Sequence, residues 1–201
     1  MIDTEVFWKG EFGDKYTLRN DGLDYGSGCS NFWTEIFSYM ENVTSVLEFG
    51  CNRGLNLDCI KKLNKGIDIN AIEINKSAAN LALSKGYRVN LGSISEEIPK
   101  AFASDLTFTC GVLIHVSPKN LEKVYKNLFK NSNKYILISE YFSTNPEEIL
   151  YRGHKSKMWK RDFAHELWEL FPSLKLVKYG FDWRYDKTRV SNDHNWFLFS
   201  K

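Results

Sequence analysis

The chain has 201 residues, of which 43% are hydrophobic, and a formal net charge of +2 at pH 7. This length suits one hydrophobic core, and because no linker, repeat or low-complexity segment divides the sequence, we expect a single domain over residues 1–201. A charge so near zero does not support nucleic-acid or membrane binding, and no run of about eighteen apolar residues is present to cross a bilayer.

Residues 1–43 come before the first predicted strand and include Trp8, Phe12 and Tyr16. We expect this segment to form an N-terminal cap over a ligand cleft, since a sheet alone would leave a bound ligand open to water. Arg19 could then pair with a ligand carboxylate in a bidentate fork. An Arg on a solvated helix surface is the alternative.

A strand, a glycine-containing turn and a helix follow this segment. Residues 45–47 read Ser-Val-Leu and begin a predicted strand, residues 48–54 read Glu-Phe-Gly-Cys-Asn-Arg-Gly, and residues 55–60 suit a helix. Because Gly lacks a Cβ, such a turn lets its backbone approach a ligand, and the unpaired N–H groups of the helix point at it. The pattern predicts a site for a nucleoside-containing cofactor. A tight connection that binds nothing is the alternative.

The second predicted strand, residues 67–73, alternates apolar with polar residues and ends in Glu73. A carboxylate at that position could accept the hydroxyls of a ribose, although a solvated acid is also common at a strand end. A helix capped by Asn75 and a third strand over residues 87–91 come next. Ser93 and Ile94 then lie where the adenine of a bound cofactor would be.

The rest of the chain continues this alternation. Residues 105–110 form the fourth predicted strand, residues 134–139 the fifth, and residues 174–179 and 196–199 two more with no helix between them. Ser117 and Pro118 should start one helix by a side-chain cap and a preset φ, and a second helix covers residues 162–171. The first helix has an apolar stripe formed by Leu121, Val124, Tyr125, Leu128 and Phe129.

This order predicts an α/β fold with a mostly parallel, seven-stranded sheet and an antiparallel last strand. Ligands of such sheets bind outside the carboxyl ends of the strands, where the glycine turn, Glu73, Ser93 and His115 all fall.

The spacing of the turn separates two kinds of cofactor. A dinucleotide-binding turn needs Gly at its first, third and sixth positions, and the chain has Gly50, Asn52 and Leu55 there. An NAD(P)-dependent enzyme is therefore disfavoured. The turn of S-adenosylmethionine (SAM) methyltransferases reads acidic-x-Gly-x-Gly-x-Gly, which Glu48, Gly50 and Gly54 match. Asn52 replaces the middle Gly, and Asn tolerates a left-handed conformation well.

Four blocks, residues 7–20, 47–56, 111–115 and 151–154, resemble the methylases associated with pseudaminic acid biosynthesis, within the class I SAM-dependent methyltransferases. The resemblance covers nearly the whole chain. It implies a Rossmann-like methyltransferase fold, SAM as cofactor and an association with nonulosonic acid pathways, but it leaves the methyl acceptor open. We expect O- or N-methylation of a sugar or nonulosonic acid that is an intermediate or product of such a pathway. A catalytically silent protein with the same fold is the alternative.

The residues expected at the cofactor come from the cap, the turn and the strand ends. They are Tyr16, Arg19, Glu48, Gly50, Cys51, Asn52, Gly54, Glu73, Ser93, Ile94 and Cys110.

Methyl transfer requires the protein to align an acceptor with an already activated methyl group and to remove a proton. His115 is the first candidate base because it follows the fourth strand and imidazole titrates near neutral pH. A satisfied core histidine is the alternative for His115, and His154 is the second candidate base.

Residues 141–161 are expected to form a substrate loop. Residues 151–161 carry five Lys or Arg and no acid, which suits an anionic sugar or nucleotide sugar, although a solvated cationic loop is the alternative. The candidate substrate contacts are Glu140, Tyr141, Tyr151, Arg152, His154 and Lys155.

Cysteine usage and the first residues indicate a cytoplasmic protein. Residues 1–5 are neither basic nor followed by a signal-type apolar region. Cys29, Cys51, Cys59 and Cys110 include no pair at metal-ligand spacing, so no metal is expected and each is predicted to be a buried free thiol. The sequence leaves monomer and homodimer equally open.

Overall fold

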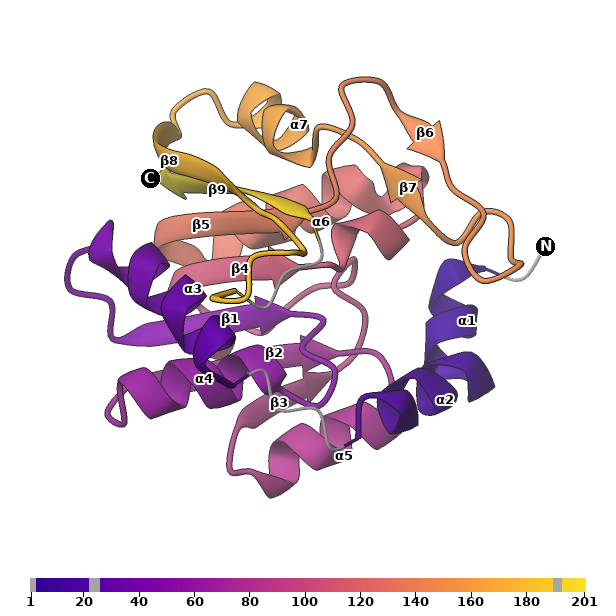
Figure 1. The fold of residues 1–201 in the computed structure, drawn as a ribbon, viewed down its shortest axis with the longest axis horizontal. Helices are drawn as coiled ribbons and strands as arrows, with labels where there is room; N and C mark the ends of the chain where they lie inside the picture. Colours follow the sequence, from indigo (N-terminus) through magenta and orange to yellow (C-terminus); the bar gives the residue numbers. More distant parts are fainter. Residues whose placement is uncertain (1–2, 22–25, 190–192) are drawn as a thin grey trace.

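The computed structural model of the chain describes residues 3–21, 26–189 and 193–201, and its centre is a seven-stranded sheet in the order β3-β2-β1-β4-β5-β9-β8 (Figure 1). β1 to β5 are parallel, whereas β9 pairs antiparallel with both β5 and β8. The strands are β1 (Ser45–Phe49), β2 (Asp68–Glu73), β3 (Arg88–Leu91), β4 (Ser104–Cys110), β5 (Ser132–Glu140), β8 (Lys175–Asp182) and β9 (His194–Ser200). The prediction of a mostly parallel sheet with an antiparallel last strand is confirmed.

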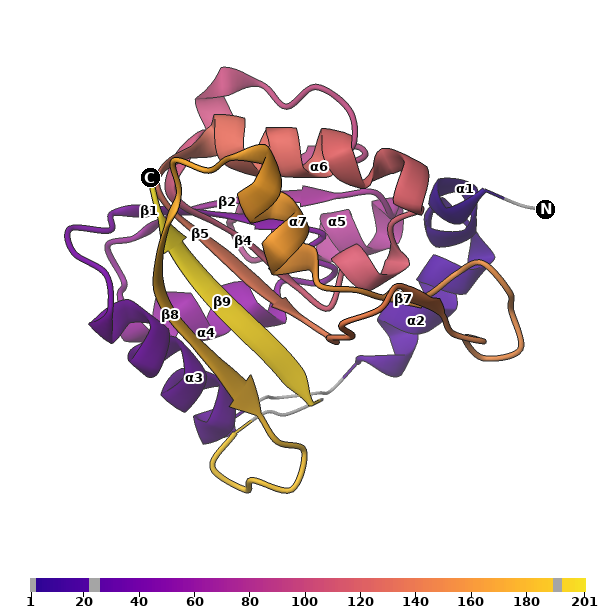
Figure 2. The same ribbon diagram turned by 90° about the horizontal axis from the view of Figure 1, so that it is seen from above.

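Helices cover both faces of the sheet, so its central strands are buried on both sides (Figure 2). One face is covered by α3 (Gly26–Ser38), α4 (Leu55–Leu63) and α5 (Lys76–Ser84). The other is covered by α6 (Pro118–Asn131) and α7 (Phe163–Leu170), with a short 3₁₀ helix η1 (Lys100–Phe102) beside them. The rings of Trp33 from α3 and Phe108 from β4 are 4.7 Å apart at the centre of the first layer.

The predicted side-chain cap is present at Asn75 and absent at Ser117. Asn75 caps α5 by accepting from the N–H of Ala78 at 2.9 Å. Asp162 caps α7 by accepting from the N–H of His165 at the same distance. Ser117 precedes α6, but its side chain makes no capping hydrogen bond, so that prediction was wrong. α6 begins at Pro118, whose fixed φ suits the first helical position.

The predicted stripe of α6 faces the core. Leu121, Val124, Tyr125 and Leu128 are buried, and the half-buried ring of Phe129 stacks on another aromatic ring, Phe171, at 4.0 Å.

Two segments lie at the carboxyl edge of the parallel strands (Figure 1). One is α1 (Thr4–Lys9) with α2 (Glu11–Arg19), and the other contains the two-stranded ribbon of β6 (Glu147–Glu148) and β7 (Trp159–Lys160). Of the range 1–43, α1 and α2 therefore lie at this edge, whereas α3 packs on a face of the sheet. Residues 1–2 and 22–25 lie outside the described residues. No helix in the described part of the chain is long and apolar enough to cross a membrane.

The cysteines differ from the prediction, because Cys29 and Cys59 form a disulfide between α3 and α4 with a Cα–Cα distance of 6.1 Å. The packing of the two helices on one face of the sheet brings these residues together across 30 positions of sequence. Cys51 is a buried free thiol as predicted, and Cys110 is a half-buried one.

Candidate functional site

The glycine turn between β1 and α4 uses the left-handed conformations that the sequence predicts. The φ angles of Gly50, Asn52 and Gly54 are 76°, 49° and 78°. The N–H groups of Gly50 and Cys51 donate to the carbonyl oxygen of Ile72 at 2.8 and 3.1 Å, which fixes the turn against β2. A Cβ at position 50 would lie 2.8 Å from a methyl carbon of Val112, so the backbone there leaves no room for a side chain.

Glu73 ends β2 and lies beside this turn. Its carboxylate accepts from the N–H of Asn52 at 2.7 Å and from the N–H of Asn75 at 2.8 Å. Burial raises the pKa of Glu73, while these backbone donors oppose the shift. Glu73 therefore connects the turn to the start of α5 and is not a solvated acid.

A cavity lies at the carboxyl edge between the turn, the strand ends and α1. Most of the predicted cofactor residues line it, namely Tyr16, Glu48, Gly50, Cys51, Asn52, Glu73, Ser93, Ile94 and Cys110. Gly54 does not line it and instead precedes α4 against the ring of Tyr87. Arg19 does not line it either, since its guanidinium lies 5.4 Å from the ring centres of Phe12 and Tyr16.

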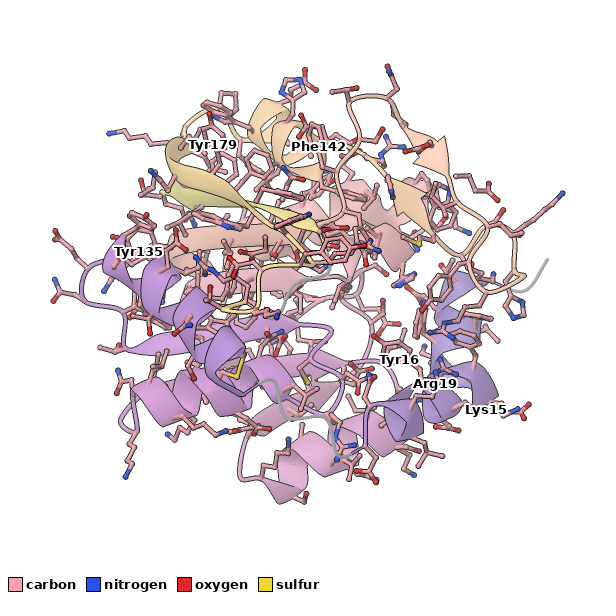
Figure 3. All side chains as sticks on the ribbon, viewed as in Figure 1. Lys15, Tyr16, Arg19, Tyr135, Phe142 and Tyr179 are labelled. Carbon is pink, nitrogen blue, oxygen red and sulfur yellow. A yellow bond between two sulfur atoms is a disulfide. The ribbon has the colours of Figure 1, made fainter. Side chains whose placement is uncertain are left out.

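The residues of α2 are divided between the cavity and the solvent. Figure 3 shows Lys15 pointing outward at the edge of the molecule, while Tyr16 lies on the side of α2 that is nearer the sheet. Burial raises the pKa of Tyr16, so its hydroxyl stays protonated and can donate a hydrogen bond.

Glu48 lines this cavity and has one unpartnered carboxylate oxygen. Its Oε1 accepts from Nδ2 of Asn56 at 2.8 Å, whereas Oε2 is buried and has no hydrogen-bond partner among the described residues. Burial raises the pKa of Glu48 to about 8. A buried carboxylate oxygen without a partner is costly, so its presence at a cavity points to a ligand that donates to it or carries positive charge.

His115 belongs to the 3₁₀ turn η2 (Leu113–His115) and also lines the cavity. Its Nδ1 lies 2.8 Å from the carbonyl oxygen of Lys157, which can only accept, so Nδ1 carries the proton and Nε2 is left as an acceptor. Its ring lies 4.7 Å from the ring centres of both Trp8 and Tyr151. Burial lowers the pKa of His115 to about 4, which keeps the imidazole neutral at pH 7.

Glu140, a predicted substrate contact, lies inside the protein and does not line the cavity. Its carboxylate accepts from the N–H groups of Val112 and Leu113 at 3.0 Å each and from that of Ile114 at 3.4 Å. Burial raises the pKa of Glu140 to about 7, and these donors oppose the shift. Glu140 therefore fixes the turn that carries His115.

The loop of residues 141–161 covers the cap through its aromatic rings. The ring of His154 lies 5.0 Å from that of Phe7 and 5.6 Å from that of Phe12, while Tyr151 contacts His115. His154 itself does not line the cavity, and neither do Tyr141 and Tyr151.

The five cations of this loop have separate environments. Arg152 and Lys155 are exposed, Lys157 is buried, Lys160 lies over the ring of Tyr141, and Arg161 pairs with Glu166 at 2.7 Å. Within the described residues, none of these five cations lines the cavity.

Comparison with known proteins identifies the fold. No protein-family model and no curated protein matches the chain. Solved structures match it at low identity. A SAM-dependent methyltransferase from Clostridium acetobutylicum ATCC 824 is 13% identical with a TM-score of 0.66, covering 94% of this chain and 99% of that one. The chain has the SAM-dependent methyltransferase fold.

Two other structures with this fold show how varied its acceptors are. Magnesium protoporphyrin IX methyltransferase (ChlM) from Synechocystis PCC 6803, solved with bound SAM, is 11% identical with a TM-score of 0.67, covering 100% of this chain and 98% of that one. CalS10, a SAM-bound amino pentose methyltransferase from Micromonospora echinaspora, is 9% identical with a TM-score of 0.65, covering 94% and 96%. The methyltransferase fold therefore leaves the acceptor open.

Several residues at the site carried no sequence signal. Glu5 of α1 and Asn120 of α6 line the cavity, although they belong to no motif. Trp8 of α1, which was expected in the cap, also lines it. His194 lies next to Cys110, with Nδ1 4.0 Å from Sγ, and burial lowers its pKa to about 4. Only the pairing of β9 with β5 brings His194 to this edge. Among the described residues, no three His, Cys, Asp or Glu are grouped closely enough to hold a metal ion.

Proposed function

We propose that the protein is a SAM-dependent methyltransferase. The observation that carries this proposal is the cavity at the carboxyl edge, which is lined by Glu48, with its unpartnered Oε2, and by the buried Glu73, beside a turn that excludes a Cβ at Gly50. SAM fits these groups, because its ribose offers two hydroxyl donors and its methionine part carries positive charge. The SAM and S-adenosylhomocysteine (SAH) bound in neighbours with the same fold support this assignment.

Different residues of the cavity would bind different parts of SAM. Glu73 would accept the ribose hydroxyls while it keeps its two backbone donors. Glu48 would face the positively charged part of the cofactor, and a nearby cation would favour the ionised carboxylate that burial alone disfavours. Ile74, Ile94 and Val112 supply apolar lining for the base.

Bound SAM supplies a methyl group already activated for transfer, so the remaining chemistry is alignment and proton removal. His115 would accept the acceptor's proton at Nε2, because Nδ1 is engaged with the carbonyl oxygen of Lys157. Glu140 maintains this geometry, because its carboxylate accepts from N–H groups of the turn that carries the His115 ring. The alternative of a core histidine is disfavoured because His115 lines the cavity.

For the acceptor we propose a sugar or nonulosonic acid of the pseudaminic acid type, or its nucleotide-linked form, methylated on oxygen or nitrogen. The four sequence blocks support this, and CalS10 is a neighbour that methylates an amino pentose. An acidic group on such an acceptor would contact Arg152 and Lys155 at the exposed side of the loop, since none of the loop cations lines the cavity formed by the described residues.

We further propose a cytoplasmic location, as the sequence suggests, although a disulfide such as Cys29–Cys59 is more typical of oxidising compartments.

The first test is calorimetric titration of the purified protein with SAM, SAH and NAD. Binding of SAM and SAH without NAD is expected, and binding of NAD alone would overturn the proposal. A screen of pathway sugars by mass spectrometry should then reveal a product with one added methyl group. SAM binding without any product would favour the catalytically silent protein.

Arg152→Ala tests the acceptor class. It should raise the KM for an anionic sugar and leave the Kd for SAM unchanged, whereas Lys65→Ala, at another exposed cation, should change neither. An uncharged acceptor, or an unchanged KM, would remove the electrostatic argument.

A further inference from the structure

Glu5 is an acid of the cap that reaches the edge of the sheet. Its Oε1 accepts from the hydroxyls of Ser93 and Ser95, each at 2.7 Å, and these two hydroxyl oxygens are 2.8 Å apart. The N–H of Glu5 donates to the carboxylate of Asp3 at 2.9 Å, which fixes the start of α1. Glu5, Ser93 and Ser95 all line the cavity. In the described part of the chain, Oε2 of Glu5 accepts no hydrogen bond, so it is available to a ligand.

The position of this carboxylate relative to Glu73 indicates which part of a ligand it meets. Glu73 pairs with Leu91 in the sheet, and the N–H of Gly92 donates to the carbonyl oxygen of Glu73 at 3.0 Å. The turn that carries Ser93 and Ser95 therefore begins directly beside Glu73. A nucleoside whose ribose is held by Glu73 would extend its base towards this turn.

The walls around this position suit a flat, mostly apolar ring with one polar edge. Ile74 follows Glu73, Ile94 lies between the two serines, and Val112 lines the same cavity from the turn after β4. The polar groups next to Ile94 include the two serine hydroxyls, which donate to Glu5, and the carboxylate of Glu5 itself. A base bound here would present its polar edge to the carboxylate of Glu5, which is a hydrogen-bond acceptor.

We propose that Glu5 recognises the 6-amino group of adenine and thereby determines which base the cofactor carries, an inference that rests on the proposed binding of SAM. An ionised carboxylate accepts hydrogen bonds and cannot donate. It matches the 6-amino donor of adenine and opposes a base with an oxygen at that position. Because Glu5 belongs to α1, the same contact would tie the cap to the bound cofactor, so discrimination between bases comes from a residue that no strand-end motif contains.

The test measures the Kd values of two ligands for the wild type and for each variant, and compares the two values within each protein. The ligands are SAH and its analogue with unsubstituted purine in place of adenine, which lacks only the 6-amino group. The wild type should bind SAH about tenfold or more tightly than the analogue, because a hydrogen bond to a charged acceptor has that effect on affinity. In Glu5→Ala the two Kd values should be nearly equal. Glu5→Gln, whose amide oxygen still accepts, should give an intermediate ratio.

The ratio of the two Kd values cancels any general effect of a variant on folding or on the position of α1. Glu11→Gln is the matched control, since Glu11 is an exposed acid of α2 that pairs with Lys15 and does not line the cavity, and it should keep the wild-type ratio. Equal affinity of the wild type for both ligands would overturn the inference, and so would a wild-type ratio in Glu5→Ala. Failure of the wild type to bind SAH at all would overturn the proposed function and this inference with it.

Discussion

The close approach of the glycine turn to Val112 can be tested by adding a single methyl group at Gly50. Gly50 has a φ of 76°, and a left-handed conformation costs a residue with a Cβ about 1–2 kcal/mol. The new Cβ would also lie 2.8 and 2.9 Å from the two methyl carbons of Val112, and such overpacking costs about 1–3 kcal/mol. Gly50→Ala should therefore lower the free energy of unfolding by about 2–5 kcal/mol.

Gly86→Ala is the matched control for the backbone effect. Gly86 has a φ of 86°, and a Cβ there would meet no atom within 4 Å. This variant should lose only about 1–2 kcal/mol, so the difference between the two variants measures the contact with Val112. Urea denaturation gives both values from the transition midpoint and the m-value.

A second change should relieve the clash. Val112→Ala removes the methyl carbons that the new Cβ would meet, so the double variant Gly50→Ala/Val112→Ala should be about 1–3 kcal/mol more stable than the two single effects predict. The reasoning is refuted if Gly50→Ala costs no more than Gly86→Ala and the two changes at positions 50 and 112 are additive.

Three further predictions concern Glu73, His115 and the disulfide. Glu73→Ala should weaken SAM binding by about 10–100-fold in a calorimetric titration, because charge-assisted hydrogen bonds contribute about 1.5–3 kcal/mol; a loss below about twofold would show that Glu73 does not hold the ribose. Burial lowers the pKa of His115 from 6.5 to about 4, so the neutral ring stabilises the fold above pH 6.5 and this contribution is lost as the pH falls from 6.5 towards 4. His115→Gln should remove up to about 1.4 kcal/mol per pH unit from that dependence, measured by urea denaturation at several pH values, and an unchanged slope would contradict a buried neutral histidine. Replacing both Cys29 and Cys59 by Ser should lower the free energy of unfolding by about 3–4 kcal/mol for a loop of this length, and four reactive thiols in the denatured, unreduced wild type would contradict the disulfide.

The sequence by itself determined the sheet and the position of the cavity. Hydrophobic alternation and the helix caps are local, so they locate the strands to within a few residues. Once the strands are parallel, their carboxyl ends must meet at one edge, and the Gly50 turn, Glu73, Ser93 and His115 meet there as predicted. The conformations of Gly50, Asn52 and Gly54 were also predictable, because Gly and Asn occupy left-handed positions more readily than most residues.

Tertiary structure alone decided how the side chains around that edge are used. Glu140 follows a strand as a substrate-binding acid would, yet its carboxylate is surrounded by the N–H groups of a turn far away in sequence. The cations of the loop after β5 suggested an anion site, but a charged group is stable where water or a partner solvates it, so Arg152 remains outside while the aromatic rings of the loop pack on the cap.

Long-range packing also explains why the sequence did not predict the contacts of Glu5 or the disulfide. The contact of Glu5 with Ser93 spans 88 positions, and Cys29 meets Cys59 across 30. Neither pairing leaves a periodic or spaced pattern in the sequence, because each depends on how whole helices pack on the sheet. Local sequence fixes the conformation of each segment, whereas long-range packing decides which polar groups are desolvated together, and that desolvation determines which of them can bind a ligand.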